Sequence, residues 1–376
     1  MKKLAFVLLL LALLTVKVYA STELPDLSKE HDAIGSAELH DSLPDDARQQ
    51  MDDLGLSPEN TGGIASFSPQ AFLKAAWQRF KDQATTPARG LGSVLGIIVL
   101  AALLDGFRSV GTSEQIKQVF GIVSSLAICA VTADPVIRCI SDTAMSIRSC
   151  ADFVLTFIPI FTGVLVAGGQ AVTASGYSMA LFAVCQVVSK VASTILVPIM
   201  GVYLGFSIIG AISPQLKITP LADAFKTLVT WSLSMIMTVF VGIMTIQSIV
   251  AGSGDTVTTK AAKFMIGSFV PVIGGALSEA FTAAQGYIHL LKTTLGAYGM
   301  IAAVAIFLPV LVRLVLWYLV TMMGGAVGEL FGLKEIAAIL KAMCTTLGIL
   351  MALVLFFILI LIISTSVVLV VGQGVI

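Results

Sequence analysis

Uninterrupted runs of apolar residues fill the chain from residue 91 onward, and each is about as long as a membrane-spanning helix. Hydrophobic residues make up 57% of the 376 residues and charged residues 12%, with a mean hydropathy of +0.98. A soluble domain carries about 25% charged residues, so this chain cannot cover a water-exposed surface. Membrane strands would alternate in polarity, whereas these runs are continuous. The sequence therefore predicts an all-α polytopic membrane protein.

We predict eight membrane segments, because about 20 apolar residues cross a bilayer. The fourth is too long for a straight span and has to tilt, break or extend past the bilayer, with Lys190 as the candidate break. The sixth is short and rich in glycine, which is compatible with a re-entrant segment. The eight segments lie at about residues 91–110, 116–133, 153–172, 179–212, 227–251, 264–282, 296–322 and 344–371.

Three segments precede the transmembrane domain, which we assign to residues 91–376. Residues 1–20 have the basic start, apolar stretch and small final residues of a secretory signal peptide, with an uncleaved anchor as the alternative. Residues 21–66 are acidic and interrupted by glycine and proline, which predicts a flexible extracytoplasmic region. Within residues 67–90, Ser68 and Pro69 begin an amphipathic helix. It lies either on the membrane surface or against the rest of the protein.

Four short motifs occur twice in the same order, and the second member follows the first by 110 to 113 residues. This spacing predicts an internal duplication, with repeat 1 at about residues 116–212 and repeat 2 at about 227–322. The alternative is convergent use of proline and glycine in kinked helices. The pairs are Asp142-Thr143 with Asp255-Thr256, residues 157–163 with 269–275, residues 174–177 with 284–287, and residues 196–199 with 307–310.

Each repeat contains three predicted spans, and this odd number predicts that the two repeats are inverted in the membrane. In transporters with inverted repeats, the working site lies at the repeat interface near the midplane. Proline leaves a helix carbonyl without its donor, and such a carbonyl has to face protein or water. The candidate residues for a pathway at the repeat interface are Pro159, Gly163, Pro198, Pro271, Gly274, Gly275, Glu279, Pro309 and Arg313.

Arg313 lies near the middle of its predicted span, where an arginine costs about 2.5–3.5 kcal/mol on insertion scales. It therefore needs a partner, and Glu279 is the nearest acidic candidate in repeat 2. We expect a Glu279–Arg313 pair at the repeat interface. The alternative is a structural role, or an Arg313 side chain that reaches to the membrane surface. Positive charges in the predicted loops do not decide the orientation of the chain in the membrane.

Other chemistry finds little support in the sequence. The five cysteines contain no CxxC pair, so a zinc or thioredoxin-type site is not expected. Cys139 and Cys150 fall in one predicted extracytoplasmic loop, where they either form a disulfide or act as unpaired small hydrophobic residues. The net charge is zero and no basic stripe carries interleaved aromatic residues, which argues against a nucleic-acid partner. We expect no enzyme activity, no cofactor and no metal.

The stretch from Gly267 to Glu279, which reads GSFVPVIGGALSE, resembles the stage III sporulation protein AE family of endospore-forming bacteria. The part from Pro271 to Glu279 is its most specific piece, and the resemblance covers most of the chain from about residue 70 onward. The order of signal peptide, acidic region, amphipathic helix and multi-span domain is also similar. The acidic region itself matches only in character.

This resemblance implies a sporulation protein in the mother-cell membrane that surrounds the forespore. It also implies a secretion-like channel complex between the two cells, with an ATPase and ring-forming membrane proteins as partners. Three hypotheses for the role of the chain stay open. It is the solute conduit or export gate of that complex, or a structural platform that recruits subunits through residues 21–84, or an independent secondary transporter. The resemblance assigns no catalytic residue.

Overall fold

The computed structural model describes residues 37–60, 63–64, 67–107, 114–213, 215–269 and 274–371. Within these ranges it does not describe the side chains of residues 105–107, 114–118, 251–254, 256–284 and 371. The described residues form helices and no strand, which confirms the all-α prediction. The predicted signal peptide lies outside them.

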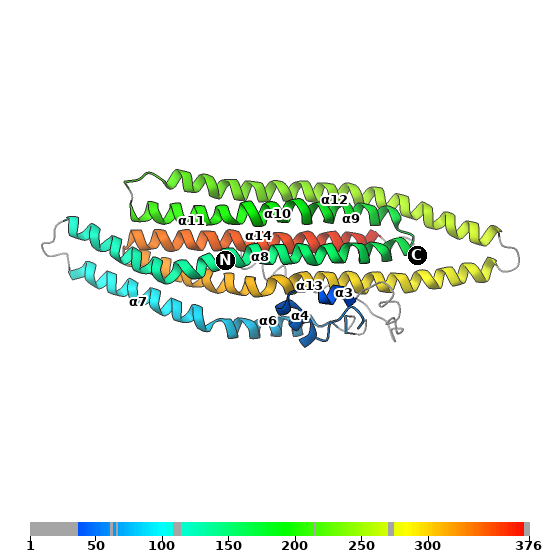
Figure 1. Cartoon of the computed structure of the whole chain (residues 1–376), viewed down its shortest axis with the longest axis horizontal. Coiled ribbons are helices and arrows are strands. Elements are labelled where there is room, and N and C mark those ends of the chain that lie inside the picture. The colour runs from blue at the N-terminus through cyan, green and yellow to red at the C-terminus, as the bar shows by residue number, and fades with distance from the viewer. Residues whose placement is uncertain are drawn as a thin grey trace.

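Long helical rods lie side by side along one axis (Figure 1). The central one is α14, which is largely buried and packs on α8, α11, α12 and α13. Five of the rods are single helices: α7 (Thr85–Phe107), α8 (Glu114–Ala167), α12 (Thr219–Phe269), α13 (Gly274–Leu330) and α14 (Lys334–Val371). One further rod follows α8 in the chain and is made of five consecutive helical segments. These are α9 (Ala171–Ala183), η1 (Val184–Val188), α10 (Ser189–Val191), η2 (Ala192–Leu196) and α11 (Val197–Ile212).

Six stretches of described helix are long and apolar enough to cross a membrane, rather than the eight we predicted. One segment fewer results from residues 134–152, which were interpreted as a loop, and the other predicted segment, residues 264–282, has no described side chains. In the structure they are the middle of α8, so the second and third predicted segments form one helix. The six are Thr85–Leu104, Val119–Ala167, Ala171–Ile212, Thr219–Val250, Gln285–Leu330 and Lys334–Val370.

The inverted arrangement of the repeats is not confirmed. Because α8 is unbroken, repeat 1 consists of two rods, α8 and α9–α11, and repeat 2 consists of α12 and α13. The first rods of the two repeats, α8 and α12, run in the same direction (Figure 1). The sixth predicted segment, residues 264–282, covers the end of α12 and the start of α13, and residues 270–273 between them are outside the described part.

The continuous α8 also corrects the prediction for the cysteines. Cys139 and Cys150 are both buried and unpaired, and they lie in this helix rather than in a loop. Eleven residues of helix separate their Cα atoms by about 16 Å, whereas a disulfide requires less than about 7 Å. The alternative interpretation, two small hydrophobic residues in the core, is correct.

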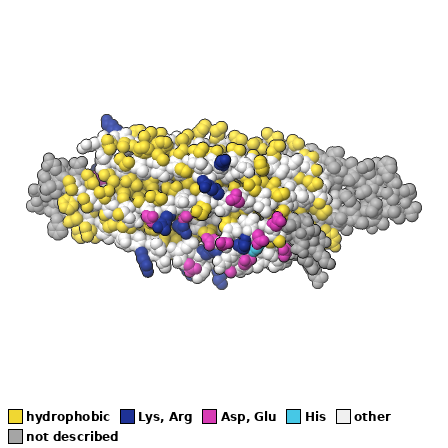
Figure 2. All heavy atoms as spheres, in the orientation of Figure 1, with side chains coloured by type: hydrophobic (Ala, Val, Ile, Leu, Met, Phe, Trp, Pro, Cys, Tyr) yellow, Lys and Arg dark blue, Asp and Glu magenta, His cyan; other side chains and the backbone are white. Residues whose placement is uncertain are grey.

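The rods are longer than a bilayer is thick. With 54 residues, α8 is about 81 Å long, and a hydrocarbon core measures about 30 Å. Exposed charged side chains occupy its middle, at Asp134, Arg138, Arg148 and Asp152. Figure 2 shows charged side chains gathered in the middle of the visible face, with hydrophobic side chains along the upper edge and toward the left end.

Three helices of the N-terminal region pack on the outside of the rods. The predicted amphipathic helix is confirmed as α6 (Pro69–Gln83), with the Ala71 amide donating to the Ser68 hydroxyl at its start. It lies against α13 and α7, and its Phe72 is buried. The helices α3 (Ala37–Asp41) and α4 (Asp45–Asp53) come from the acidic segment that we predicted to be flexible. Apolar side chains at intervals of four residues explain their docking, because Leu39, Leu43, Ala47 and Met51 are all buried.

Candidate functional site

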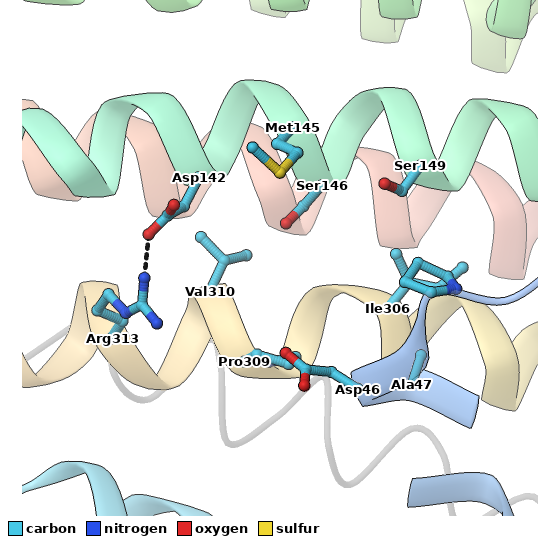
Figure 3. Close-up of a pocket in the computed structure, with 11 residues that line it drawn as sticks. Asp46, Ala47, Asp142, Met145, Ser146, Ser149, Ile306, Pro309, Val310 and Arg313 are labelled. Atoms are coloured by element: carbon cyan, nitrogen blue, oxygen red, sulfur yellow. Dashed lines mark hydrogen bonds and ion pairs between the residues drawn. The ribbon is translucent and has the colours of Figure 1, made fainter. Parts of the chain in front are cut away.

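An ion pair joins the helices α8 and α13. Arg313 of α13 donates from its guanidinium to the carboxylate of Asp142 on α8, as Figure 3 shows. The two side chains are 44% and 30% exposed, so both are only partly screened by solvent. Asp142 lies among the charged residues in the middle of α8, and apolar stretches of that helix lie on either side.

A cavity of about 200 Å³ opens beside this ion pair. In Figure 3, Asp142 and Ser146 point from α8 toward α13, and Val310 points back. Pro309 contributes to the wall and cannot donate a backbone hydrogen bond to the carbonyl of Ala305, which lies one turn earlier in the same helix. The lining residues are Pro44, Asp46 and Ala47 around α4, Asp142, Met145, Ser146 and Ser149 of α8, and Ile306, Pro309, Val310 and Arg313 of α13.

The helices α3 and α4 cover the cavity and are held by polar contacts as well as by their buried apolar face. His40 Nδ1 lies 3.1 Å from the Tyr298 hydroxyl on α13, and His40 Nε2 lies 3.0 Å from a carboxylate oxygen of Asp52 on α4. From α6, Arg79 donates to the Asp46 carbonyl at 3.0 Å. We call residues 37–53 the cap. It closes one side of the cavity, and Asp46 and Ala47 of α4 form part of the wall.

A second polar cluster joins the repeats further along the rods. Asp255 of α12 is 2% exposed, and its carboxylate accepts from the amides of Val172 and Thr173 at 2.9 and 3.0 Å. These amides belong to the first turn of α9, which has no internal acceptor for them. Nearby, the buried Lys292 of α13 donates to the side-chain oxygen of Gln170 at 2.9 Å. Asp255 therefore caps a helix of the other repeat.

Of the five candidate residues whose side chains the structure describes, Pro309 and Arg313 come together, since both line the cavity. Pro159 and Gly163 lie on the exposed side of α8, and Pro198 lies on the exposed side of α11. Pro271 is outside the described residues. Gly274, Gly275 and Glu279 are in the first turns of α13, where side chains are not described.

The predicted Glu279–Arg313 pair is wrong. Both residues belong to the one helix α13, and 34 residues of helix place them about 51 Å apart. Asp142 takes the position that we assigned to Glu279. In the sequence, Asp142 stood out only as a marker of the predicted repeat, because residues 134–152 were predicted to be a loop. The i, i+4 spacing of Asp134, Arg138 and Asp142 was the available signal that this stretch is helical.

His40 and Asp46 were also missed as site residues. Their segment was predicted to be flexible because of its charge, and the four-residue spacing of its apolar side chains was not used. Among the described residues, no group of three His, Cys, Asp or Glu side chains is arranged to hold a metal ion.

Comparison with known proteins gives one family. The family model for stage III sporulation protein AE matches residues 56–372, a range that contains α6 to α14 and both polar clusters but begins after the cap. The stage III sporulation protein AE of Bacillus subtilis (strain 168) is 24% identical over 260 residues. The aligned region covers 67% of this chain and 65% of the relative, just under two thirds of the relative's length. No solved structure matches the chain.

Proposed function

We propose that this chain, which belongs to the stage III sporulation protein AE family, is a multi-span component of a channel complex between mother cell and forespore. Within that complex it acts as a gate for a polar path, and the cleft between α8 and α13 is the gated position. Its location is the mother-cell membrane around the forespore, and its role is not enzymatic. Its partners are the other stage III membrane proteins, including ring-forming subunits, and the ATPase of the complex.

One observation carries the proposed gate. The Asp142–Arg313 pair and a cavity of about 200 Å³ lie together between two membrane-length apolar helices, under a separate cap. Ionisable residues between the apolar stretches of long helices are rare, and they commonly mark solute or ion pathways. An ion pair that joins two helices, with free space beside it, can open when the helices separate. The repeats meet at this position, which is where transporter sites are commonly found.

The first experiment replaces the chromosomal gene of the endospore-forming host with variants. We expect Arg313→Met and Asp142→Asn each to lower the yield of heat-resistant spores by at least tenfold while the protein still accumulates in the membrane. Arg138→Met is the matched control. Arg138 lies one turn before Asp142 on α8, and among the described residues it pairs only with the exposed Asp134 of the same helix. Normal sporulation of the Arg313→Met strain with normal protein levels would rule out the gate.

The second experiment tests whether the cleft is reached by water. Single cysteines replace Ser146 and Ser149, which line the cavity, in a variant without native cysteines. We expect both to react with a membrane-impermeant maleimide, and to react faster when the cap is deleted. A cysteine in place of Val166, which is exposed on the apolar part of α8, is the protected control.

A structural platform is the second candidate function, and the outer side of the cap favours it. Asp45, Asp52 and Asp53 are exposed there and form an acidic surface suited to a basic partner. Deletion of residues 21–66 separates the two functions. A platform loses co-purification of the ring-forming subunits, whereas a gate keeps its subunits and loses control of solute flux.

A further inference from the structure

The rod from Ala171 to Ile212 contains two π-helical turns, η1 and η2, on either side of the short α10. In η1 the Ser189 amide donates to the Val184 carbonyl, and in η2 the Val197 amide donates to the Ala192 carbonyl, in each case five residues back. Well under 1% of residues in proteins are π-helical. Single π turns inside α-helices frequently occur at functional sites, and this rod has two within 13 residues.

A polar side chain accompanies one turn, and a proline follows the other. The Ser189 hydroxyl donates to the Cys185 carbonyl, the group that an α-helical Ser189 amide would use. The hydroxyl competes with the amide for this carbonyl, which can accept two hydrogen bonds, and here the amide bonds one residue further back. Pro198 lies two residues after the end of η2 and has no amide hydrogen for the Thr194 carbonyl. The backbone at the junctions stays in the right-handed helical region, so the rod is widened rather than broken.

The second repeat provides a comparison within the same chain. Pro309 corresponds to Pro198, yet it lies inside the uninterrupted α-helix α13. Proline alone therefore does not produce a π turn here. The two rods also differ in packing, because α13 is largely buried and the α9–α11 rod is largely exposed. The exposed rod has room to change its helical register.

The π-helical segment touches the charged middle of α8. Arg148 of α8 donates from Nε to the Ser193 hydroxyl in η2 at 3.3 Å. Lys190, between the two π turns, is exposed. The residue that the sequence marked as a candidate break is therefore flanked by two widened turns instead of a loop.

We propose that residues 184–198 form a hinge, in which the rod changes between a π-helical and an α-helical register. Conversion of one π turn to an α turn, with the same residues, rotates α11 by about 100° and moves it about 1.5 Å along its axis relative to α9. This rotation separates Ser193 from Arg148 and changes the contacts of α11 with α8, α12 and α14. The hinge does not depend on the proposed gate, because it rests on the backbone of this rod alone.

Removal of one residue tests the hinge. Val187 is an exposed residue of η1. A π turn contains one residue more than an α turn, so deletion of Val187 converts η1 to an α-helical turn. The position of α11 relative to α9 stays the same. Spin labels at Ile137 of α8 and Ile209 of α11, both exposed, report the rotation by pulsed electron paramagnetic resonance in lipid nanodiscs. We expect two distance populations in the full-length protein and one in the Val187 deletion.

Deletion of the exposed Val202 in the regular α-helix α11 is the matched control, and it should lower the melting temperature.

A second variant keeps the chain length. Ser189→Ala removes the hydroxyl that occupies the Cys185 carbonyl, so it should shift the population toward the α-helical distance. The hinge is refuted if the unmodified chain gives one narrow distance that Ser189→Ala leaves unchanged. It is also refuted if the Val187 deletion unfolds as readily as the Val202 deletion. Neither result bears on the gate, which is tested by sporulation.

Discussion

Asp142 and Asp255 occupy matching positions in the two repeats, and each binds to the other repeat. Asp142 on the first rod of repeat 1 pairs with Arg313 on the second rod of repeat 2. Asp255 on the first rod of repeat 2 caps α9 on the second rod of repeat 1. Each contact therefore joins the first rod of one predicted repeat to the second rod of the other, and the partner is a side chain in one case and a helix terminus in the other. Single residues hold the two repeats in register.

Removal of one charge of the Asp142–Arg313 pair should destabilise the protein more than removal of both. Arg313→Met leaves a carboxylate beside apolar side chains, and we expect a loss of about 1–2 kcal/mol. This is less than for a fully buried pair, because both side chains are partly exposed. The double variant with Asp142→Asn should recover part of that loss. Thermal unfolding in detergent measures this, and losses that simply add would contradict the coupling.

Asp255→Ala should weaken the start of α9. The amides of Val172 and Thr173 lose their acceptor, as they would at a helix that has lost its N-cap, and this costs about 1–2 kcal/mol. Hydrogen exchange of these two amides should become faster while that of α14 stays slow. Asp134→Ala removes an exposed carboxylate that makes only an i, i+4 pair, so it is the matched control. Unchanged exchange at Val172 would mean that Asp255 does not cap α9.

At the scale of elements, two glycines show how closely the rods approach. A Cβ atom at Gly299 of α13 would lie 2.6 Å from the Phe157 ring of α8. That ring is held between Phe153 and Phe161 by stacking and cannot easily move. At Gly163 of α8, nothing lies within 4 Å of an added Cβ. The first glycine sets the spacing of two helices, whereas the second has no such contact.

These two glycines should therefore respond in opposite ways to alanine. Gly299→Ala forces α8 and α13 apart, and we expect a net loss of about 1 kcal/mol even though alanine favours a helix. Gly163→Ala should gain about 0.5–1 kcal/mol, because it removes backbone freedom without a clash. Midpoints of thermal unfolding measured side by side decide this. Equal effects of the two substitutions would refute the close contact at Gly299.

Most helices could be predicted from the sequence, but the charged middle of α8 could not. Apolar runs and the Ser68–Pro69 start predicted the helices, because lipid solvation and capping act locally. The charges of residues 134–152 were assigned to a loop, although helix α8 holds them with i, i+4 pairing. This one error divided helix α8 into two predicted segments, and it concealed Asp142. Arg313 and Pro309 were found, since an arginine or a proline in an apolar run is conspicuous without any knowledge of neighbours.

At the scale of the whole molecule, the cap is a separate piece that docks on the bundle. Leu43→Asp should release it, because a carboxylate replaces a side chain that is 3% exposed. Limited proteolysis should then cut between residues 54 and 60 much faster than in the unmodified protein. Gln49→Asp adds the same charge at an exposed position of α4 and should leave the cutting rate unchanged. Equal resistance of both variants would show that Leu43 is not needed for docking.

The length of the bundle determines where lipid can lie. Because α8 is about 81 Å long, one bilayer covers less than half of it, and its exposed charges exclude lipid from its middle. We expect cysteines in place of Arg138 and Asp152 to react with an impermeant maleimide in native membranes, in a variant without native cysteines. A cysteine in place of Val166 should react only after detergent treatment, because this exposed apolar side chain faces lipid. Protection of positions 138 and 152 in membranes, followed by reaction in the purified protein, would instead assign the charged middle to a partner subunit. Protection in both would mean that the middle of α8 is buried within the chain, which contradicts the exposure of its charges.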